Sequence, residues 1–328
     1  MKKILSRLYQ HETLTRDEAR EVLVRMSAGE MNAAQMASFM TVYLMRNITV
    51  PEIEGFRDAL LEMRVPIDLG GIESIDIVGT GGDGKNTFNI STCAAIVVAG
   101  AGYKVTKHGN NSASSVSGSS NVLQHFGYVF SADPDTLLRQ LERSNFCFFH
   151  APFFHPAMKA VAPVRRELGV KTFFNMLGPL VNPARPTHQL FGTFSLELSR
   201  LYQYILQESG QSFAVVYALD GYDEISLTGD VKVRTPNGES LLSPADFGKP
   251  RYRPEDLHGG DSVASAARIF QNVLENKATP AQKDVVIANA GMAISCLKPD
   301  AGLEACMDEA RESIESGRAW QALRALVE

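Results

Sequence analysis

The sequence has no apolar run approaching the roughly 18 residues that a membrane-spanning helix requires. Its first residues, MKKILSRLYQHE, are too polar beyond Leu8 to predict a secretory signal. Cysteine is also scarce, and the four that occur, Cys93, Cys147, Cys296 and Cys306, form no C-x-x-C pair. We therefore expect reduced thiols in or near the core of a cytoplasmic protein.

An excess of positive charge is missing as well. The 32 Lys and Arg residues are outnumbered by 37 Asp and Glu residues, which gives a net charge of −5. This balance argues against a nucleic-acid-binding protein, because such proteins are usually basic. With 45% hydrophobic and 21% charged residues, the chain has the composition of a globular protein with a sizeable core. Its 328 residues leave room for about two domains.

Acidic residues are absent from one long interval, since no Asp or Glu occurs from Gly84 to Ala132. The interval instead carries basic side chains at Lys85, Lys104, Lys107, His108 and His125. Within it, residues 107–121 read KHGNNSASSVSGSSN and are crowded with Ser, Gly and Asn. Such a surface suits a ligand that bears several phosphates, because no carboxylate repels it. A solvated Ser-rich linker is the alternative.

Residues 76–92, DIVGTGGDGKNTFNIST, are the most informative stretch of the chain. A strand-like run at residues 75–78 leads into four closely spaced glycines, Gly79, Gly81, Gly82 and Gly84. Polar residues then precede a helix-like run at 93–99, namely Asn89, Ser91 and Thr92. Glycines let the backbone approach an anion closely, and the N–H groups at a helix start supply donors. We interpret the stretch as a phosphate-binding loop, with a ligand-free glycine turn as the alternative.

Two familiar phosphate-binding patterns fit this loop only in part. Gly79, Gly81 and Gly84 satisfy G-x-G-x-x-G, but a dinucleotide site also needs an acidic residue about 20 positions later, and none occurs. Gly79, Gly84 and Lys85 begin the pattern G-x-x-x-x-G-K-[ST], but Asn86 stands where a hydroxyl would bind Mg²⁺. Neither pattern is therefore favoured.

The first 66 or so residues are predicted to be almost entirely helical. Thr15 followed by Asp17 and Glu18 is a good helix start, and later apolar residues repeat at helical spacing. Further helices are expected at about residues 33–46 and 51–63, with Pro in the first turn of the latter. An apolar run is wide for so small a unit and is either core or a dimer face: Met36, Phe39, Met40, Tyr43, Leu44 and Met45.

From Ile72 onward, short strand-like runs alternate with helices. Strands are expected at residues 75–78, 103–106, 146–149, 189–193 and 213–219, and helices at 134–143 and 196–207, among others. This alternation predicts an α/β fold with a mostly parallel sheet flanked by helices and with ligands at the carboxyl ends of the strands. A hairpin is expected at residues 231–238, and helices follow from about residue 261. We thus expect a small helical domain at residues 1–70, joined by helices from about 160–185, and an α/β domain at residues 71–328.

An acidic pair follows the last of these strands. Asp223 and Glu224 fall just beyond residues 213–219, where a strand end meets a loop. Adjacent carboxylates there can hold Mg²⁺, which is usually bound by one or two carboxylates plus substrate phosphates. An exposed acidic turn is the alternative.

Residues 153–183 contain a second candidate site. Arg165 and Arg166 lie on a predicted helix that could restart at Pro163, and whichever of them faces inward is suited to gripping a planar carboxylate. Farther along, Gly178 and Pro183 belong to a predicted rigid turn that could close over a ligand. A surface Arg pair and a plain connecting turn are the alternatives.

Together these motifs resemble a known family. GTGGDG with TFNIST, KHGN followed by SS and SGSS, VRRELG with KTFFN and LGPLVNP, and DGYDEIS occur in the order found in anthranilate phosphoribosyltransferases. The similarity spans nearly the whole chain. It implies transfer of the phosphoribosyl group of 5-phosphoribosyl 1-diphosphate (PRPP) to anthranilate in tryptophan biosynthesis, with release of diphosphate. It also implies a Mg²⁺-dependent homodimer formed through the helical domain, and an active site between the helical and α/β domains.

The resemblance further implies roles for individual residues. PRPP would be held by Gly79, Gly82, Asp83, Thr87, Asn89, Ile90, Ser91, Thr92, Lys107 and Ser119. Ser91 would bind one Mg²⁺, and Asp223 and Glu224 would bind a second. Anthranilate would contact Gly79, Asn110 and Arg165, in a pocket lined by His108, Pro152, His155 and Gly178. No residue stands out as a general base.

Two positions depart from the family pattern. Asn111 replaces the Arg of KHGNR, and Val116 replaces a frequent Lys. Both changes remove positive charge near the expected phosphates. They leave the affinity for PRPP undetermined, but they do not alter the expected class of reaction. Two rival functions remain open as well. One is a pyrimidine nucleoside phosphorylase-like enzyme, which would handle one phosphate and would not need the acidic pair; the other is a non-catalytic nucleic-acid-binding relative of the same fold.

Overall fold

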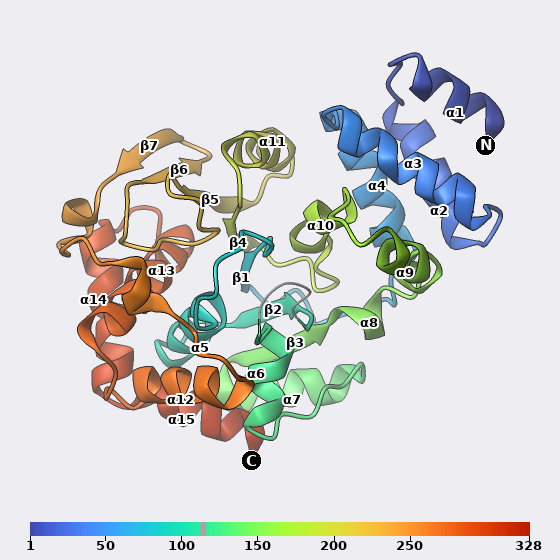
Figure 1. Cartoon of the computed structure of the whole chain (residues 1–328). Coiled ribbons are helices and arrows are strands. Elements are labelled where there is room, and N and C mark those ends of the chain that lie inside the picture. The colour runs from blue at the N-terminus through green and yellow to red at the C-terminus, as the bar shows by residue number, and fades with distance from the viewer. Residues whose placement is uncertain (112–115) are drawn as a thin grey trace. The chain divides into compact units, whose positions relative to one another are not determined.

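The structure, a computed structural model, describes residues 1–111 and 116–328, so that Ser114 and Ser115, the SS pair that follows KHGN, lie outside the described residues. The chain divides into two compact units. The helical unit comprises Met1–Ile67 and Ala151–Pro183, and the sheet unit comprises Asp68–His150 and Ala184–Glu328. Figure 1 shows the elements of both units.

The helical unit is built from two separate stretches of the chain. Its elements are α1 (Lys2–Tyr9), α2 (Arg16–Ser27), α3 (Ala33–Met45), α4 (Val50–Glu62), α8 (Ala151–Phe154), α9 (Ala157–Leu168), α10 (Phe174–Leu177) and the 3₁₀ turn η1 (Gly178–Val181). The predicted start of α2 is confirmed, because the Thr15 hydroxyl accepts from the Glu18 N–H while the Glu18 carboxylate accepts from the Thr15 N–H. Asn32 and Gln35 form the same reciprocal cap on α3.

Two local features differ from the sequence-based expectations. Helix α9 passes through Pro163 without a restart and ends at Gly169, which has a left-handed φ of 65°. The expected turn at residues 175–183 is a short helix, α10, followed directly by η1. Rigid 3₁₀ geometry suits this segment because Pro179 presets the backbone at the start of the turn.

The wide apolar run on α3 is divided between core and surface. Met36, Phe39, Met40 and Tyr43 are buried, whereas Leu44 is 46% exposed and Met45 is 80% exposed. The buried part packs edge-on against aromatic rings of other helices, since Phe39 lies 5.9 Å from both Phe56 and Phe173. Most of the run therefore belongs to the core, and its last two side chains, Leu44 and Met45, are exposed to solvent.

A buried carboxylate joins the loops of the helical unit. Glu52 on α4 is fully buried and accepts hydrogen bonds from the Leu14 N–H (3.0 Å), the Thr49 N–H (3.0 Å) and the Arg46 guanidinium (2.5 Å). The Tyr43 hydroxyl adds a longer one at 3.3 Å. Burial alone would raise the pKa of Glu52, but the hydrogen bonds from Arg46, Leu14 and Thr49 outweigh it and hold the pKa below its usual value.

The sheet unit contains one seven-stranded sheet with the order β3-β2-β1-β4-β5-β6-β7. Its strands are β1 (Ile75–Gly79), β2 (Val105–Gly109), β3 (Phe146–His150), β4 (His188–Gly192), β5 (Ser212–Ala218), β6 (Val231–Thr235) and β7 (Gly238–Leu242). The first five strands of that order are parallel, and β6 and β7 pair antiparallel at one edge. The predicted α/β class is confirmed, and the predicted hairpin extends the sheet.

Helices cover the sheet, as Figure 1 shows. They are α5 (Ile90–Gly100), α6 (Ser119–His125), α7 (Pro134–Ser144), α11 (Leu196–Gln207), α12 (Val263–Leu274), α13 (Pro280–Leu297), α14 (Leu303–Glu315) and α15 (Arg318–Val327), with 3₁₀ turns η2 (Pro244–Phe247) and η3 (Pro254–Leu257). Ala214 and Val216 of β5 join the large apolar cluster that includes α5 and α13. The alternate residues Phe213 and Val215 point to the opposite face, as strand geometry requires.

Two boundaries in the sheet unit moved from their predicted positions. β2 begins at Val105 instead of residue 103, and Tyr103 instead donates from its hydroxyl to Glu309 at 2.6 Å. Helix α5 begins at Ile90 instead of residue 93, so Ser91 and Thr92 lie in its first turn and Asn89 is its N-cap. All four cysteines are buried free thiols, as expected. Across the described residues, none of the helices is both long and apolar enough to cross a membrane.

Replacing Glu52 by Ala should lower the free energy of unfolding by about 3 kcal/mol, because it leaves the Arg46 charge and two N–H groups buried without their acceptor. The contribution of a carboxyl group with a lowered pKa is present above its unfolded pKa of about 4.3 and is lost as the pH falls through its folded pKa. Urea titrations at neutral and acidic pH measure both effects. The control, Glu62→Ala, removes an exposed pair with Arg20 and should cost less than about 1 kcal/mol. Equal losses for the two variants would contradict this account.

Candidate active site

The glycine-rich loop leaves the carboxyl end of β1 and enters α5. Gly81, Gly82 and Gly84 have φ values of 64°, 73° and 76°, in the left-handed region that side chains with a Cβ rarely adopt. The Thr80 N–H donates to the Gly192 carbonyl at 2.9 Å, and the Gly81 N–H donates to Asp223 Oδ2 at 2.6 Å. The loop is therefore attached to the end of β4 and to the loop after β5.

The start of α5 keeps its N–H groups available. Asn89 is the N-cap residue, but its side chain makes no capping hydrogen bond and instead donates to the Ser117 carbonyl at 2.8 Å. Ser91 is half-buried and Thr92 is buried in the first turn. Uncapped N–H groups at a helix start carry partial positive charge and suit an anion such as a phosphate.

The predicted acidic pair lies against the ends of two neighbouring strands. Gly79 of β1 and Gly192 of β4 are directly paired in the sheet, and Asp223 packs over both. A Cβ at Gly79 would lie 2.3 Å from Asp223 Oδ2, and a Cβ at Gly192 would lie 1.5 Å from the Asp223 carbonyl oxygen. Only glycine permits this approach at either position. The requirement for Gly192 was missed from the sequence, because it depends on a contact with a residue 31 positions later.

This end of the sheet concentrates acidic groups in poor contact with water. Burial and the neighbouring Asp83 raise the pKa of Asp223. Burial, Asp223 and Asp83 raise the pKa of Glu224 well above its usual value. The nearby Thr87 side chain partly opposes the rise in the pKa of Glu224, and the Oε1 atom of Glu224 is buried with no hydrogen-bond partner. A cation would stabilise the ionised form of such a group.

The residues fit a hard divalent cation such as Mg²⁺, because they offer carboxylate and hydroxyl oxygens and one orphaned buried acceptor. Within residues 1–111 and 116–328, however, no group of three or more His, Cys, Asp and Glu side chains is arranged to hold a metal ion. A cation at Asp223 and Glu224 would thus need further oxygen ligands from a bound molecule, as is usual for Mg²⁺ with substrate phosphates.

The end of β2 supplies a buried lysine beside these acids. Lys107 is 2% exposed and donates to the Ile77 carbonyl. Burial lowers the pKa of Lys107 to about 8, although Asp76, Asp223 and Glu224 oppose that shift. The neighbouring His108 is buried too. Because β1, β2, β4 and β5 are parallel, their carboxyl ends and these side chains gather at one edge of the sheet.

The segment after β2 is exposed at its polar residues. Asn110 and Asn111 are exposed, and the Asn111 N–H donates to the Asn110 side-chain oxygen at 2.8 Å. Ser119, at the start of α6, donates from its hydroxyl to the Asn110 carbonyl at 3.1 Å. Val116, the other departure from the family pattern, is also exposed. Both departures therefore lie at the surface.

The remaining candidates lie in the helical unit. Arg165 on α9 is half-buried, whereas Arg166 is exposed, so Arg165 is the inward-facing one of the pair. Its guanidinium lies 5.2 Å from the centroid of the Phe174 ring, and Asn175 Oδ1 is 3.5 Å away. Burial lowers the pKa of Arg165. Arg165 forms no salt bridge with any of the described residues. Its guanidinium is therefore suited to binding a ligand carboxylate.

The same unit holds the other expected pocket residues. His155 is buried, its Nε2 lies 2.8 Å from the Val181 carbonyl, and burial lowers its pKa to about 4. The ring is therefore neutral near pH 7 and is positioned by the backbone. Pro152 and Gly178 are exposed. These residues and Arg165 belong to one unit, whereas Gly79, His108 and Asn110 belong to the other.

Comparison with known proteins defines the class. A family model described as "Glycosyl transferase family, helical bundle domain" matches residues 2–63, and one described as "Glycosyl transferase family, a/b domain" matches residues 72–320. The two units of the chain thus match the two domains of a glycosyl transferase family.

More specific matches come from individual proteins. An anthranilate phosphoribosyltransferase of Cytophaga hutchinsonii is 56% identical over 327 residues, covering 100% of both chains. One from Bacteroides thetaiotaomicron is 55% identical, covering 100% of this chain and 99% of the relative. The crystal structure of the Thermus thermophilus enzyme has a TM-score of 0.92 and 35% identity, covering 98% of each chain. The chain belongs to the anthranilate phosphoribosyltransferase family.

A solved structure with ligands is also similar. The anthranilate phosphoribosyltransferase from Saccharomyces cerevisiae in complex with PRPP and Mg has a TM-score of 0.91 and 28% identity, covering 98% of this chain and 95% of that one. Another structure of the yeast enzyme is in complex with 4-fluoroanthranilate. These matches favour the transferase over the phosphorylase-like and nucleic-acid-binding alternatives that the sequence left open.

The buried ammonium of Lys107 should make stability depend on pH in an unusual direction. Its folded pKa of about 8 lies below the unfolded value of about 10.4, so the unfolded chain binds more protons between these values and stability rises with pH. Relative to Lys107→Met, the unmodified chain should gain up to about 3 kcal/mol across that interval. Urea titrations of both proteins at a series of pH values measure the difference. A difference that does not change with pH would show that Lys107 titrates normally.

Proposed function

We propose that this protein transfers the phosphoribosyl group of PRPP to anthranilate, giving N-(5-phosphoribosyl)anthranilate and diphosphate in tryptophan biosynthesis. The observation that carries the proposal is the Asp223 loop packed onto the glycine-rich loop, which combines oxygen ligands for a cation with N–H donors for phosphates. Membership of the family supports the choice of substrates.

PRPP binds at the carboxyl edge of the sheet in this proposal. Its diphosphate and ribose contact the glycine-rich loop and the first turn of α5, through Gly79, Gly82, Asp83, Thr87, Asn89, Ile90, Ser91 and Thr92. Lys107 and Ser119 add contacts from the end of β2 and the start of α6. The uncapped start of α5 supports this assignment because it leaves N–H groups to bind phosphate oxygens, and the left-handed glycines let the backbone approach the ligand closely.

Two Mg²⁺ ions accompany PRPP in the proposal. Ser91 holds one through its hydroxyl, and Asp223 and Glu224 hold the other. When bound, Mg²⁺ neutralises charge that develops on the departing diphosphate. The orphaned Oε1 of Glu224 supports the second site, and the Mg in the yeast complex supports a metal requirement.

Arg165 binds the anthranilate carboxylate in this proposal. Its guanidinium packs on the Phe174 ring and forms no salt bridge with any of the described residues. Asn110 and Gly79 also contact anthranilate, and the pocket is lined by His108, Pro152, His155 and Gly178. A neutral His155 suits an uncharged aromatic ring, and its pKa of about 4 makes it a poor proton acceptor near pH 7.

The reaction proceeds by positioning and electrostatic stabilisation, without a covalent enzyme intermediate. N–H donors of the glycine-rich loop and α5 stabilise the charge on the departing diphosphate. The anthranilate amine then forms the bond to the ribose C1 carbon. None of the described side chains is assigned as a general base, because an aniline-type nitrogen loses its proton readily once it has attacked.

One assay tests the reaction directly. Anthranilate fluorescence should fall when the protein is supplied with PRPP and Mg²⁺, and it should stay constant when either is omitted. Fluorescence that persists in the complete mixture would refute the proposed function. Consumption of a pyrimidine nucleoside with inorganic phosphate would instead identify the phosphorylase-like activity.

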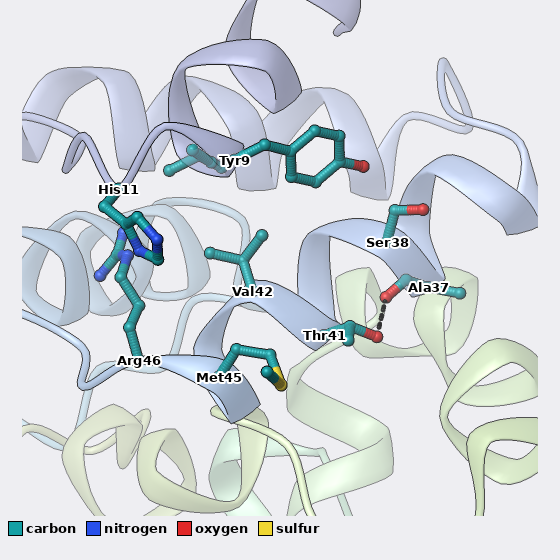
Figure 2. A pocket seen from close by; sticks show the side chains of 9 residues that line it. Tyr9, His11, Ala37, Ser38, Thr41, Val42, Met45 and Arg46 are labelled. Carbon is teal, nitrogen blue, oxygen red and sulfur yellow. Dashed lines mark hydrogen bonds between the residues drawn. The ribbon is translucent and has the colours of Figure 1, made fainter.

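We also propose a cytoplasmic homodimer formed through the helical unit. A groove of about 450 Å³ lies between the end of α1 and α3. Figure 2 shows Val42, Met45 and Arg46 opposite Tyr9 and His11 in this groove. Tyr9 is 57% exposed and Met45 is 80% exposed, so a second copy would bury both. Sedimentation of the purified protein tests this, and a purely monomeric species at micromolar concentration would refute it.

The two neighbouring arginines should differ sharply in their effect on anthranilate use. Arg165→Ala should weaken it by roughly 2 to 4 kcal/mol and leave PRPP binding nearly unchanged, because a charged bidentate contact is lost. Arg166→Ala is the matched control and should have little effect, since Arg166 is exposed. Steady-state kinetics with each substrate varied in turn measure both. A larger loss for Arg166→Ala would refute the assignment.

The acidic pair should bind Mg²⁺ only when diphosphate is present. The double variant Asp223→Asn with Glu224→Gln should raise the Mg²⁺ concentration that gives half-maximal rate and should lower turnover. Its melting temperature should not fall, because it removes carboxylates whose ionisation burial disfavours. Activity against Mg²⁺ concentration and calorimetry without PRPP are the measurements. Tight Mg²⁺ binding to the unmodified protein alone would contradict a site completed by substrate.

A further inference from the structure

Hydrogen bonds join the glycine-rich loop to a segment more than 170 residues later in the chain. This segment is residues 258–260, which we call the brace. The brace follows η3 and consists of His258, Gly259 and Gly260. The Asn86 carbonyl accepts from the Gly259 N–H at 2.7 Å, and the Asn86 side-chain amide donates to the Gly260 carbonyl at 2.9 Å. Thr87 and His258 pair as an isolated antiparallel bridge. Asn86 thus joins the two segments with both its backbone and its side chain.

The brace can lie this close only because it contains glycine. A Cβ at Gly259 would lie 2.6 Å from the Thr87 carbonyl oxygen, a distance that real Cβ atoms do not show. Gly260 has a left-handed φ of 80°, and a Cβ there would lie 2.2 Å from the Ser265 hydroxyl. The contact therefore constrains both segments at backbone level.

The imidazole of His258 contributes less than the Asn86 amide. His258 Nδ1 lies 3.1 Å from the Gly260 N–H, and its Nε2 lies 3.2 Å from the Asn86 side-chain nitrogen. A neutral imidazole accepts at only one nitrogen, so it can satisfy only one of these two donors at a time. The amide of Asn86, by contrast, donates to the Gly260 carbonyl whichever tautomer is present. Asn86 is therefore the principal side-chain link to the brace.

The loop residues on either side of Asn86 contact the acidic segment. The Thr87 side chain lies close enough to Glu224 to lower the pKa of that carboxyl group. Lys85 lies with its ammonium 4.6 Å from the centroid of the Tyr222 ring. A shift of the backbone at Asn86 would therefore also move Lys85 and Thr87, which lie beside Tyr222 and Glu224.

We propose that Asn86 is a positioning residue, which holds the glycine-rich loop against the brace so that Thr87 and the loop N–H groups are preorganised for a diphosphate with Mg²⁺. This inference rests on the proposed function for its physiological ligand. It also explains the Asn where a P-loop would have a metal-binding hydroxyl: the side chain is turned to the Gly260 carbonyl and serves the loop's position.

The test is calorimetric titration of the protein with inorganic diphosphate in the presence of Mg²⁺. Asn86→Ala removes the amide and should weaken diphosphate binding about five- to tenfold, the loss expected for one hydrogen bond. Gly259→Ala pushes the brace away without altering any residue assigned to the ligand, and should weaken binding at least as much. Asn272→Ala on α12 and Gly302→Ala, whose added Cβ would meet nothing within 4 Å, are the matched controls and should bind normally.

Kinetics separate positioning from a general loss of structure. In both Asn86→Ala and Gly259→Ala, the KM for PRPP and the Mg²⁺ concentration that gives half-maximal rate should rise by about the same factor as the dissociation constant for diphosphate. The KM for anthranilate should stay within about twofold. Unchanged diphosphate affinity in Asn86→Ala, or equal losses for both substrates, would overturn the proposal. Gly259→Ala provides an independent disruption should Asn86→Ala fail to fold.

The diphosphate titration also keeps two failures distinct. If the unmodified protein does not consume anthranilate, the proposed function fails, while weaker diphosphate binding in Asn86→Ala still supports the positioning role. If the protein consumes anthranilate and the variant binds diphosphate normally, only the positioning role fails.

Discussion

The close packing of Asp223 over the paired glycines of β1 and β4 is the contact on which the candidate site depends. Gly79 and Gly192 are paired neighbours on the adjacent strands β1 and β4, and a Cβ at either position would overlap Asp223. The approach lets the glycine-rich loop donate to the Asp223 carboxylate, so that the loop that follows β1 and the loop that follows β5 form one surface. Without two residues that lack a Cβ, the acids would be displaced from the strand ends and no common binding surface would form.

The electrostatic character of the surface follows from this packing. Burial and the neighbouring Asp83 raise the pKa of Asp223, burial with Asp223 and Asp83 raises that of Glu224, and burial lowers that of Lys107. Ionisation of the two carboxyl groups is therefore disfavoured by their surroundings, and a cation with a phosphorylated ligand would offset that cost. The helical unit differs, because hydrogen bonds satisfy the buried Glu52, while Arg165 packs on an aromatic ring and forms no salt bridge with any residue in the described part of the chain.

Much of the fold was predictable because local signals were strong. The capped starts of α2 and α3, the helix from Leu196 to Gln207 and the parallel strands all follow from periodicity and capping residues. Boundaries were less predictable where a polar residue serves a distant partner. The helix after the glycine-rich loop was expected to begin at residue 93, but it begins at Ile90, directly after Asn89, whose amide donates to the Ser117 carbonyl. Tyr103 was expected in a strand, but its hydroxyl donates to Glu309. A restart at Pro163 was one possibility for the predicted helix, but α9 runs through this residue, because packing on α2 and α3 outweighs the lost hydrogen bond.

The sequence by itself determined the class of fold and the family, and it singled out the glycine-rich loop and the acidic pair as candidates, since these depend on residue types and their order along the chain. It did not determine which of two adjacent arginines faces inward, why Gly192 must be glycine, or what Asn86 does in place of a metal-binding hydroxyl. Those were decided by tertiary contacts: Phe174 against Arg165, the Asp223 carbonyl over Gly192, and the Gly260 carbonyl beside Asn86. The physical reason is that a side chain's role in a site depends on the donors, acceptors and free volume around it, and residues far away in the chain supply these only after folding.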